Sequence, residues 1–263
     1  MRRLKFHYST VYHFDGPVTE HHFVVRCLPT TGSRQKITLE KLHISSNDFC
    51  SETEDAFKNK ILYGDIIEPH SEFAFEITGV AEIDSLYLDS SEKFTGIFRM
   101  PTCLTGNGTE IAFHIDRLQK QCMGMKPLDT FRKINSYVNH LLQYQQGVTN
   151  VDTTAEAACS LGAGVCQDYS HIMLAILRGM GFSARYIVGM MLGEGASHAW
   201  VEVWNDMDTS GWYGFDPTNN REVDDSYIKI SCGRDYKDCT VIRGMFKGTG
   251  SQQQMVWVNV EEL

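Results

Sequence analysis

The stretch GVCQDYSHIMLAILRGMGF, residues 164–182, constrains the fold of this chain more than any other segment. Its apolar residues recur at helical spacing, which predicts one helix beginning near Cys166, and Gly181 is a natural C-terminal stop. Three segments rich in Val, Ile, Tyr and Trp follow it: SARYIVGMML, SHAWVEVWN and GWYGFDPT. They are typical of strands. The sequence therefore predicts helices packed against an antiparallel sheet.

The first 95 residues have a different texture. KFHYSTVYHF and HHFVVRCLP are rich in β-branched and aromatic residues, and GP at 16–17 separates them. Further segments alternate apolar and polar residues, which favours an N-terminal β-sandwich-like domain over residues 1–95. His21 and His22 are adjacent and would face opposite sides of a strand, so they make poor joint metal ligands.

A second domain is predicted over residues 96–263. Helices are expected at 109–121, from Pro127 onward and over AEAACSLG, before the helix at Cys166. The tail segments DSYIKIS and QQMVWVNVEEL are expected to be further strands of this second domain. The fold class that follows is α+β.

Charge and composition exclude several classes of partner. The net charge is −9 and the pI is near 5.5, which argues against nucleic acid and against anionic membrane surfaces. No stretch approaches the roughly 18 consecutive apolar residues of a membrane helix, and the basic N-terminus lacks the apolar run of a signal peptide. We therefore expect a cytoplasmic protein.

The eight cysteines contain no CxxC pair. Their spacing favours neither a disulfide framework nor a zinc module, so we expect no metal and no cofactor. The ordinary interpretation of each cysteine is a small buried apolar residue. Cys166 needs a separate argument, because it opens a predicted helix.

A thiol nucleophile needs a base, and the base needs a group that orients it. The N-terminus of a helix favours the thiolate of Cys166. His198 opens the predicted strand HAWVEVW, and Asp216 ends the next strand, YGFDPT. If these two strands form an antiparallel hairpin, His198 lies beside Asp216. The order Cys, His, Asp is then consistent with a catalytic triad, although a buried structural cysteine remains the alternative.

Three blocks of the sequence, GVCQDYSHIMLAILRGMGFSARYIVG, SHAWVEVW and GWYGFDPTNN, resemble the signature blocks of the transglutaminase-like superfamily. The segments YQQGVTNVDTTAEAA and GRDYKDCTVIRGMFKGTG resemble the bacterial members of that superfamily that are regarded as cysteine proteases. VYHFDGPV and EPHSEFAFEITGV resemble their N-terminal β domain more loosely. The resemblance implies a papain-like core with Cys166 as nucleophile, His198 as general base and then acid, and Asp216 as orienter.

Three functions stay open at this point. The leading one is hydrolysis of a peptide or amide bond in a peptide or protein substrate through a thioester acyl-enzyme. The second is acyl transfer from a protein glutamine to an amine, and the third is a non-catalytic binding module of the same fold. The backbone N–H of Cys166 is the expected oxyanion donor, and Gln143, Tyr144 and Gln145 are candidates for a second.

The roles of several neighbours are also open. Asp168 suits either an acid that supports the catalytic residues from behind or, as we favour, a carboxylate that stabilises the first helical turn. Trp200 and Trp212 are candidates for the wall of the cleft, and a core role is equally compatible with each. His171 is interpreted as a packed or capping histidine. The acidic run at 206–208 resembles a calcium loop in isolation but lacks the further ligands of one. Oligomeric state is not readable from the sequence.

Overall fold

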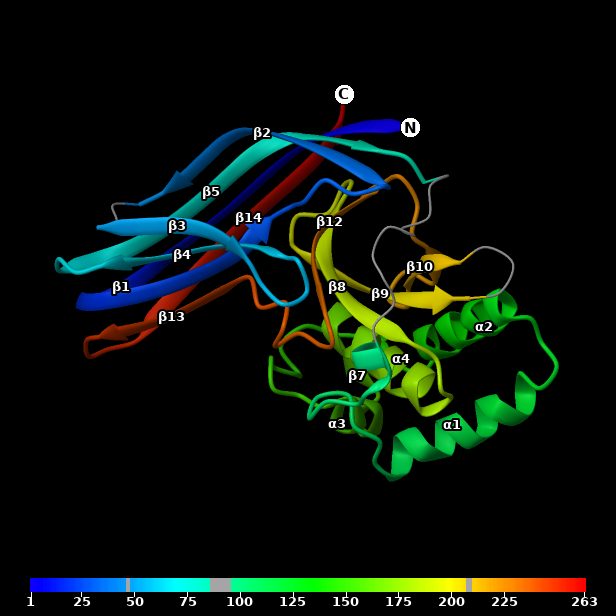
Figure 1. The fold of residues 1–263 in the computed structure, drawn as a ribbon. Coiled ribbons are helices and arrows are strands. Elements are labelled where there is room, and N and C mark those ends of the chain that lie inside the picture. The colour runs from blue at the N-terminus through cyan, green and yellow to red at the C-terminus, as the bar shows by residue number, and fades with distance from the viewer. Residues whose placement is uncertain (46–47, 86–95, 207–209) are drawn as a thin grey trace.

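The computed structural model describes residues 1–45, 48–85, 96–206 and 210–263 (Figure 1). It is a mixed structure of antiparallel strands and helices, which confirms the predicted α+β class. A seven-stranded sheet of mainly N-terminal residues lies beside a five-stranded sheet that carries the helices. No helix within the described ranges is long and apolar enough to cross a bilayer.

The seven-stranded sheet is organised around one long strand, β1 (Arg2–Leu28). The first half of β1 pairs with β5 and β14, and its second half pairs with β4 and β13. The register shifts at the GP dipeptide, where β1 bends, so its two halves build two layers around one apolar core. The other strands of this sheet are β2 (Gln35–Ile44), β3 (Phe49–Glu54), β4 (Lys60–Ile66), β5 (His70–Ile83), β13 (Ile242–Lys247) and β14 (Gln252–Glu262).

The sequence predicts two separate strands around Gly16 and Pro17. The structure instead has a single continuous strand with an irregular register there. Proline has no N–H to donate to a ladder, so it is tolerated where the pairing of β1 passes from one set of partners to the other. The dipeptide therefore bends the strand rather than ending it.

The five-stranded sheet has the order β11-β10-β9-β8-β12. Its strands are β8 (Ala184–Met191), β9 (His198–Asn205), β10 (Gly211–Asp216), β11 (Arg221–Glu222) and β12 (Tyr227–Gly233). A two-stranded parallel pair, β6 (Gln143–Tyr144) and β7 (Ala163–Gly164), precedes it. The acidic run at 206–208 lies largely outside the described residues.

The helices cover one face of this sheet (Figure 1). They are α1 (Thr109–Gln121), α2 (Pro127–Asn139), α3 (Ala155–Leu161) and α4 (Cys166–Gly179), with a short 3₁₀ turn, η1, at Gly96–Arg99. The predicted helices therefore appear where the sequence placed them. Helix α4 packs against β8 and β9 and is the most deeply buried helix, with an apolar core that extends to Phe131 and Phe215.

The two sheets share an interface. Met190 of β8 and Ile228 and Ile230 of β12 belong to the apolar core of the N-terminal sheet. Of the two tail segments predicted as strands, DSYIKIS falls largely in β12 of the five-stranded sheet, whereas QQMVWVNVEEL falls in β14, which pairs with β1, as β13 also does. The N- and C-termini consequently lie close together (Figure 1).

Candidate active site

Cys166 is the first residue of α4 and is half-buried. The turn that presents it is held by Asp168, whose Oδ2 accepts hydrogen bonds from the backbone N–H of Val165 at 2.8 Å and from the hydroxyl of Thr149 at 2.7 Å. Gly164 is required beside this carboxylate, because a Cβ there would lie 2.5 Å from Asp168 Oδ2. Asp168, the third residue of α4, thus closes the first turn of the helix that carries the thiol, because its carboxylate accepts the N–H of the N-cap residue Val165.

His198 and Asp216 are brought together by the β9–β10 hairpin. The two strands pair antiparallel, with Phe215 opposite Val201, so the beginning of β9 meets the end of β10. His198 Nε2 lies 2.7 Å from Asp216 Oδ2, and both side chains are buried. This is the pairing that the hairpin argument predicted.

Asp216 is fixed by more than the histidine. Its Oδ1 accepts the backbone N–H groups of Thr218 at 2.9 Å and Asn219 at 3.1 Å. Its Oδ2 accepts the amide of Asn219 at 2.8 Å and the hydroxyl of Tyr227 at 2.8 Å, in addition to His198. Burial alone would raise the pKa of Asp216, but these donors outweigh burial and hold the pKa below its usual value. Asp216 is therefore a carboxylate with a fixed orientation.

The imidazole of His198 interacts with both partners. Burial by itself would lower its pKa, whereas the hydrogen bond with Asp216 and a hydrogen bond with Cys166 raise the pKa of His198 to about 10. Since Nε2 is used by Asp216, Nδ1 is the ring nitrogen left for the Cys166 thiol. The arrangement suits a group that accepts a proton from a thiol and later donates it.

A cavity of about 250 Å³ opens at Cys166 and His198. We call it the Cys166 cavity. Its walls come from both sheets. The seven-stranded sheet, called the N-terminal module below, contributes Tyr8 of β1 and Gln254 and Val256 of β14. The other lining residues are Val165, Gln167, Tyr186, Val188, Ser197, Ala199, Tyr236 and Val241. An uncharged group that reaches this cavity meets the thiol and the imidazole together.

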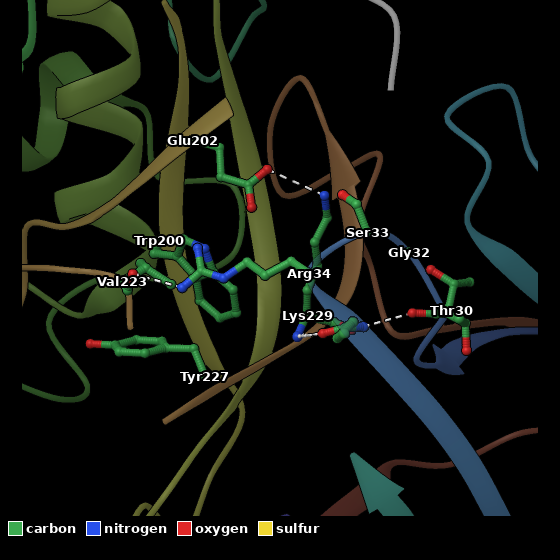
Figure 2. Close-up of a pocket in the computed structure, with 11 residues that line it drawn as sticks. Thr30, Gly32, Ser33, Arg34, Trp200, Glu202, Val223, Tyr227 and Lys229 are labelled. Carbon is green, nitrogen blue, oxygen red and sulfur yellow. Dashed lines mark hydrogen bonds and ion pairs between the residues drawn. The ribbon is translucent and has the colours of Figure 1, made fainter. Parts of the chain in front are cut away.

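A smaller cavity of about 50 Å³ is lined by Trp200, which lies beside the His198 ring, and by Tyr227, which binds Asp216 (Figure 2). Trp200 and Tyr227 form one side of it, and the connection between β1 and β2 forms the other. Arg34 from that connection extends toward Trp200 and donates to the backbone oxygens of Val223 at 2.7 Å and Asp224 at 2.9 Å (Figure 2). The N-terminal module thus holds the segment that leads to Tyr227.

Trp200 and Trp212, the two tryptophans proposed for the wall of the cleft, differ in position. Trp200 lies beside the His198 ring, with centroids 6.4 Å apart, and faces the small cavity rather than the Cys166 cavity. Trp212 packs under the guanidinium of Arg185, 4.2 Å from its ring centre, and belongs to the core. Trp200 therefore lies against the His198 ring, and Trp212 is not among the described residues that line the Cys166 cavity.

The upstream candidates lie on β6 and just after it. The parallel pairing of β6 with β7 brings Gln143, Tyr144 and Gln145 beside the residues that lead to Cys166. The backbone N–H groups of Gln143 and Gln145 already donate to the carbonyls of Gly162 and Gly164, at 2.9 Å each. As hydrogen-bond donors to a ligand, these two residues therefore offer their exposed side-chain amides.

His171 is completely buried. Its Nε2 accepts the backbone N–H of Tyr236 at 3.2 Å, and its ring packs against Tyr186. Burial lowers the pKa of His171 to about 3, so it is neutral at ordinary pH. This agrees with the interpretation of a packed histidine, and it shows how the Tyr236 wall of the Cys166 cavity is supported.

Several site residues were missed by the sequence reasoning. Tyr227 and Asn219 bind Asp216, and Tyr236 and Gln254 line the Cys166 cavity. Asn219 had a signal, because an asparagine just after a strand that ends in Asp-Pro commonly forms side-chain bonds to the turn. Tyr227 and Gln254 had none, since each comes from a strand whose partner only the folded chain reveals.

Comparisons with known proteins agree with this architecture. The family model described as "Transglutaminase-like superfamily" matches residues 116–217, and the one described as "Bacterial transglutaminase-like N-terminal region" matches residues 4–82. An uncharacterized protein of Mycobacterium leprae is 28% identical, with 100% of each chain covered. An uncharacterized protein of Mycobacterium tuberculosis is 26% identical, with 98% of this chain and 92% of the relative covered.

A solved structure from Cytophaga hutchinsonii, titled a "Putative Cysteine Protease", is 20% identical. It superposes with a TM-score of 0.78 over 100% of this chain and 91% of that chain, which shows a shared fold. The N-terminal match, the core match and this fold all agree with the resemblance seen in the sequence. Residues 116–217 are therefore a transglutaminase-like core, and residues 4–82 before it are a bacterial transglutaminase-like N-terminal region.

Proposed function

We propose that this protein is a thiol-dependent hydrolase of peptide or amide bonds in a peptide or protein substrate. The observation that carries the proposal is His198, which lies between the Asp216 carboxylate and the Cys166 thiol at the mouth of one cavity. The match to the transglutaminase-like superfamily supports an enzyme with a protein substrate. A thiol, an imidazole and an orienting carboxylate in this order are the parts that acyl transfer to a thiol requires.

The reaction begins with attack of the Cys166 sulfur on the substrate carbonyl while His198 holds the proton of the thiol, in keeping with the raised pKa of His198. The negative charge that develops on the carbonyl oxygen needs a fixed donor. As the first residue of α4, Cys166 has a backbone N–H with no carbonyl partner inside the helix, and it is the proposed donor. A side chain of Gln143, Tyr144 or Gln145 is the proposed second donor.

The tetrahedral intermediate collapses when His198 gives its proton to the departing nitrogen, which leaves as an amine or as ammonia and leaves a thioester on Cys166. Water then attacks the thioester, His198 takes a proton from that water, and the acid product departs from Cys166 while His198 keeps that proton. Asp216 keeps the imidazole oriented and stabilises its charged form throughout.

Two other outcomes share the same residues. If an amine instead of water reaches the thioester, the protein is a glutamine acyltransferase, and if no substrate reaches Cys166 it is a binding module. A cytoplasmic location belongs to the proposal as well. Its support is that all eight cysteines, each within the described ranges, are free thiols, as a reducing compartment allows.

Alkylation with iodoacetamide tests the nucleophile directly. We expect Cys166 to react at pH 7 faster than Cys50 and Cys103, although those two are exposed and Cys166 is half-buried. His198→Ala should slow alkylation of Cys166 by about tenfold or more, the order of effect of losing a general base, and leave Cys50 and Cys103 unchanged. Peptide mapping by mass spectrometry gives the three rates from one digest.

Equal rates at the three cysteines, unaffected by His198→Ala, would refute the catalytic proposal and favour the binding module. With a substrate in hand, release of ammonia or amine without incorporation of an added primary amine would separate hydrolysis from transfer. Cys166→Ala serves as the inactive control in that assay.

A further inference from the structure

A second cavity, of about 390 Å³, lies within the N-terminal sheet module. Phe14, Phe73, Phe246, Tyr12 and His21 face it, and we call it the aromatic pocket. Among the described residues that line it there is no lysine, arginine, aspartate or glutamate. The lining therefore suits a flat, uncharged group, and its volume admits one as large as an indole.

The aromatic pocket adjoins the Cys166 cavity along two strands. Gln252, Gln254 and Val256 are alternate residues of β14 and share one face. Gln252 lines the aromatic pocket, and the other two line the Cys166 cavity. Val241, directly before β13, lines the Cys166 cavity, and Ile242, the first residue of β13, lines the aromatic pocket. Along both segments, the residues that line one cavity are therefore one or two positions away from residues that line the other.

The distance between the two cavities can be estimated along strand β1. Tyr8 lines the Cys166 cavity and Tyr12 lines the aromatic pocket, and both lie on the inner side of β1. At about 3.3 Å per residue, four residues correspond to roughly 13 Å. An extended peptide covers the same distance with about four residues. A substrate whose carbonyl lies at Cys166 could therefore place a side chain in the aromatic pocket.

An extended substrate that spans from Cys166 to the aromatic pocket would pass along β13 and β14, and both are edge strands in the part of the chain that the structure describes. There β13 and β14 each pair with β1 and with no other strand. An edge strand offers backbone donors and acceptors to an added extended chain. This favours a peptide over a compact small molecule as the occupant.

His21 sets the chemistry of the aromatic pocket. His70 Nδ1 donates to the backbone oxygen of Glu68 at 2.9 Å, so in the neutral pair His70 Nε2 accepts. It accepts from His21 Nδ1 at 3.1 Å, which leaves a lone pair on His21 Nε2. His21 is only 4% exposed, and its Nε2 has no hydrogen-bond partner among the described residues.

Burial, with the neighbouring imidazoles of His70 and His22 contributing, lowers the pKa of His21 to about 4. The ring is therefore neutral at ordinary pH and keeps its lone pair. A buried acceptor surrounded by aromatic rings matches an aromatic group that carries one N–H or O–H donor.

We infer that the aromatic pocket binds a tryptophan or tyrosine side chain of an extended peptide substrate, about four residues from the carbonyl that Cys166 attacks, with the N–H or O–H of that side chain donating to His21 Nε2. The peptide part of this inference rests on the proposed function. The pocket part does not, because it follows from the lining and from His21.

Indole and 1-methylindole test the pocket on the intact chain without any variant. They differ in one donor, so indole should bind about 2-fold to 10-fold more tightly, the effect of one net hydrogen bond. Isothermal titration calorimetry measures both. In His21→Phe the preference for indole should disappear.

Gly244→Ala provides a second check. A Cβ at this position would lie 2.7 Å from His21 Nε2, so the methyl group should block the acceptor and weaken indole binding by about tenfold, as loss of a well-fitted contact does. Gly16→Ala is the matched control, because its Cβ would meet only ordinary contact at 3.6 Å. It should bind indole as the unmodified chain does.

A peptide library incubated with the full-length protein tests the link to the Cys166 cavity. The products should be enriched in Trp or Tyr at one fixed position about four residues from the processed carbonyl, and Gly244→Ala should remove that enrichment. Equal binding of the two indoles, or no binding, overturns the pocket assignment. Preferential indole binding without positional enrichment overturns the substrate assignment. Failure of the alkylation test at Cys166 removes the thiol chemistry alone, and the indole comparison then still decides the pocket.

Discussion

At the scale of single residues, Asp216 is the group on which the candidate site depends most. Its two oxygens accept five hydrogen bonds, from His198, Thr218, Tyr227 and twice from Asn219. Those bonds cannot all be replaced by an amide, which has one accepting oxygen. The position of the imidazole therefore follows from how this carboxylate is held.

The raised pKa of His198 predicts a pH dependence of stability. In the unfolded chain a histidine titrates near pH 6.5, whereas in the folded chain His198 keeps its proton up to about pH 10. Its stabilising contribution is fully present below pH 6.5 and is lost as the pH rises toward 10. Urea unfolding of the native chain should show a steeper decline across this window than His198→Gln. Parallel curves for the two proteins would contradict the assigned shift.

Tyr227→Phe should test the bond behind the carboxylate. Loss of the hydroxyl removes one donor from Asp216 Oδ2, so the pKa of Asp216 should rise and the pH profile of Cys166 alkylation should shift. We expect the alkylation rate at pH 7 to fall by a few-fold, about the effect of one hydrogen bond to a charged group.

Tyr63→Phe is the matched control, since Tyr63 is exposed on β4. It should leave the alkylation profile unchanged. A profile for Tyr227→Phe identical to that of the native chain would show that the hydroxyl only fills space.

At the scale of elements, helix α4 contributes both to the hydrophobic core and to the candidate site. The apolar side of the helix is buried in the core, and its first turn presents Cys166. Gly162, with φ of +70°, ends α3, and Gly164 leaves room for Asp168, so the chain can turn sharply into α4. The segment SLGAGVC has two glycines for two different steric reasons.

Asp168→Ala should show how much this turn needs its cap. The substitution leaves the N–H of Val165 and the hydroxyl of Thr149 without their acceptor, and we expect a loss of about 1–2 kcal/mol in the free energy of unfolding. Alkylation of Cys166 should slow as well, because the first turn of α4 loosens. Denaturant unfolding and the alkylation rate measure the two effects.

Asp129→Ala is the control for Asp168→Ala. Asp129 is the acidic residue in the first turn of α2, but it is exposed, and its ion pair with Arg132 is worth little. Its loss should cost a few tenths of a kcal/mol, in line with an exposed charge near a helix end. If both variants lose the same stability, Asp168 has no special capping role.

At the scale of the whole molecule, strand β1 brings the N-terminal and C-terminal parts of the chain together. Its first half lies between β5 from the N-terminal part and β14 from the C-terminal end. The Cys166 cavity takes walls from both modules, and Arg34 reaches across to the segment before Tyr227. The candidate site is therefore a property of the assembled molecule rather than of residues 96–263 alone.

A chain that begins at residue 96 should consequently fail to fold cooperatively. Strands β13 and β14 would lose their partner, and Met190, Ile228 and Ile230 would lose the core they pack into. We expect binding of a hydrophobic dye and no sharp thermal transition, as for a state that lacks fixed packing. A cooperative transition with alkylation of Cys166 as in the full chain would show that residues 96–263 form an independent domain.

The sequence by itself determined most of the helices and strands and the residues of the candidate site. The helical spacing after Cys166, the glycine stop and the β-rich segments depend on neighbours a few positions apart, so their patterns can be recognised locally. His198 and Asp216 could also be paired, because one short hairpin joins them.

Only the tertiary structure decided which strands are neighbours across the chain. Alternating patterns look alike in β1, β12 and β14, and nothing local shows that β14 pairs with β1 or that Tyr227 of β12 reaches Asp216. Those choices depend on the total apolar surface buried when the two sheets close together, a quantity spread over the whole chain. The sequence thus named the candidates for nucleophile, base and orienter, and only the fold supplied the walls of the cavity around them.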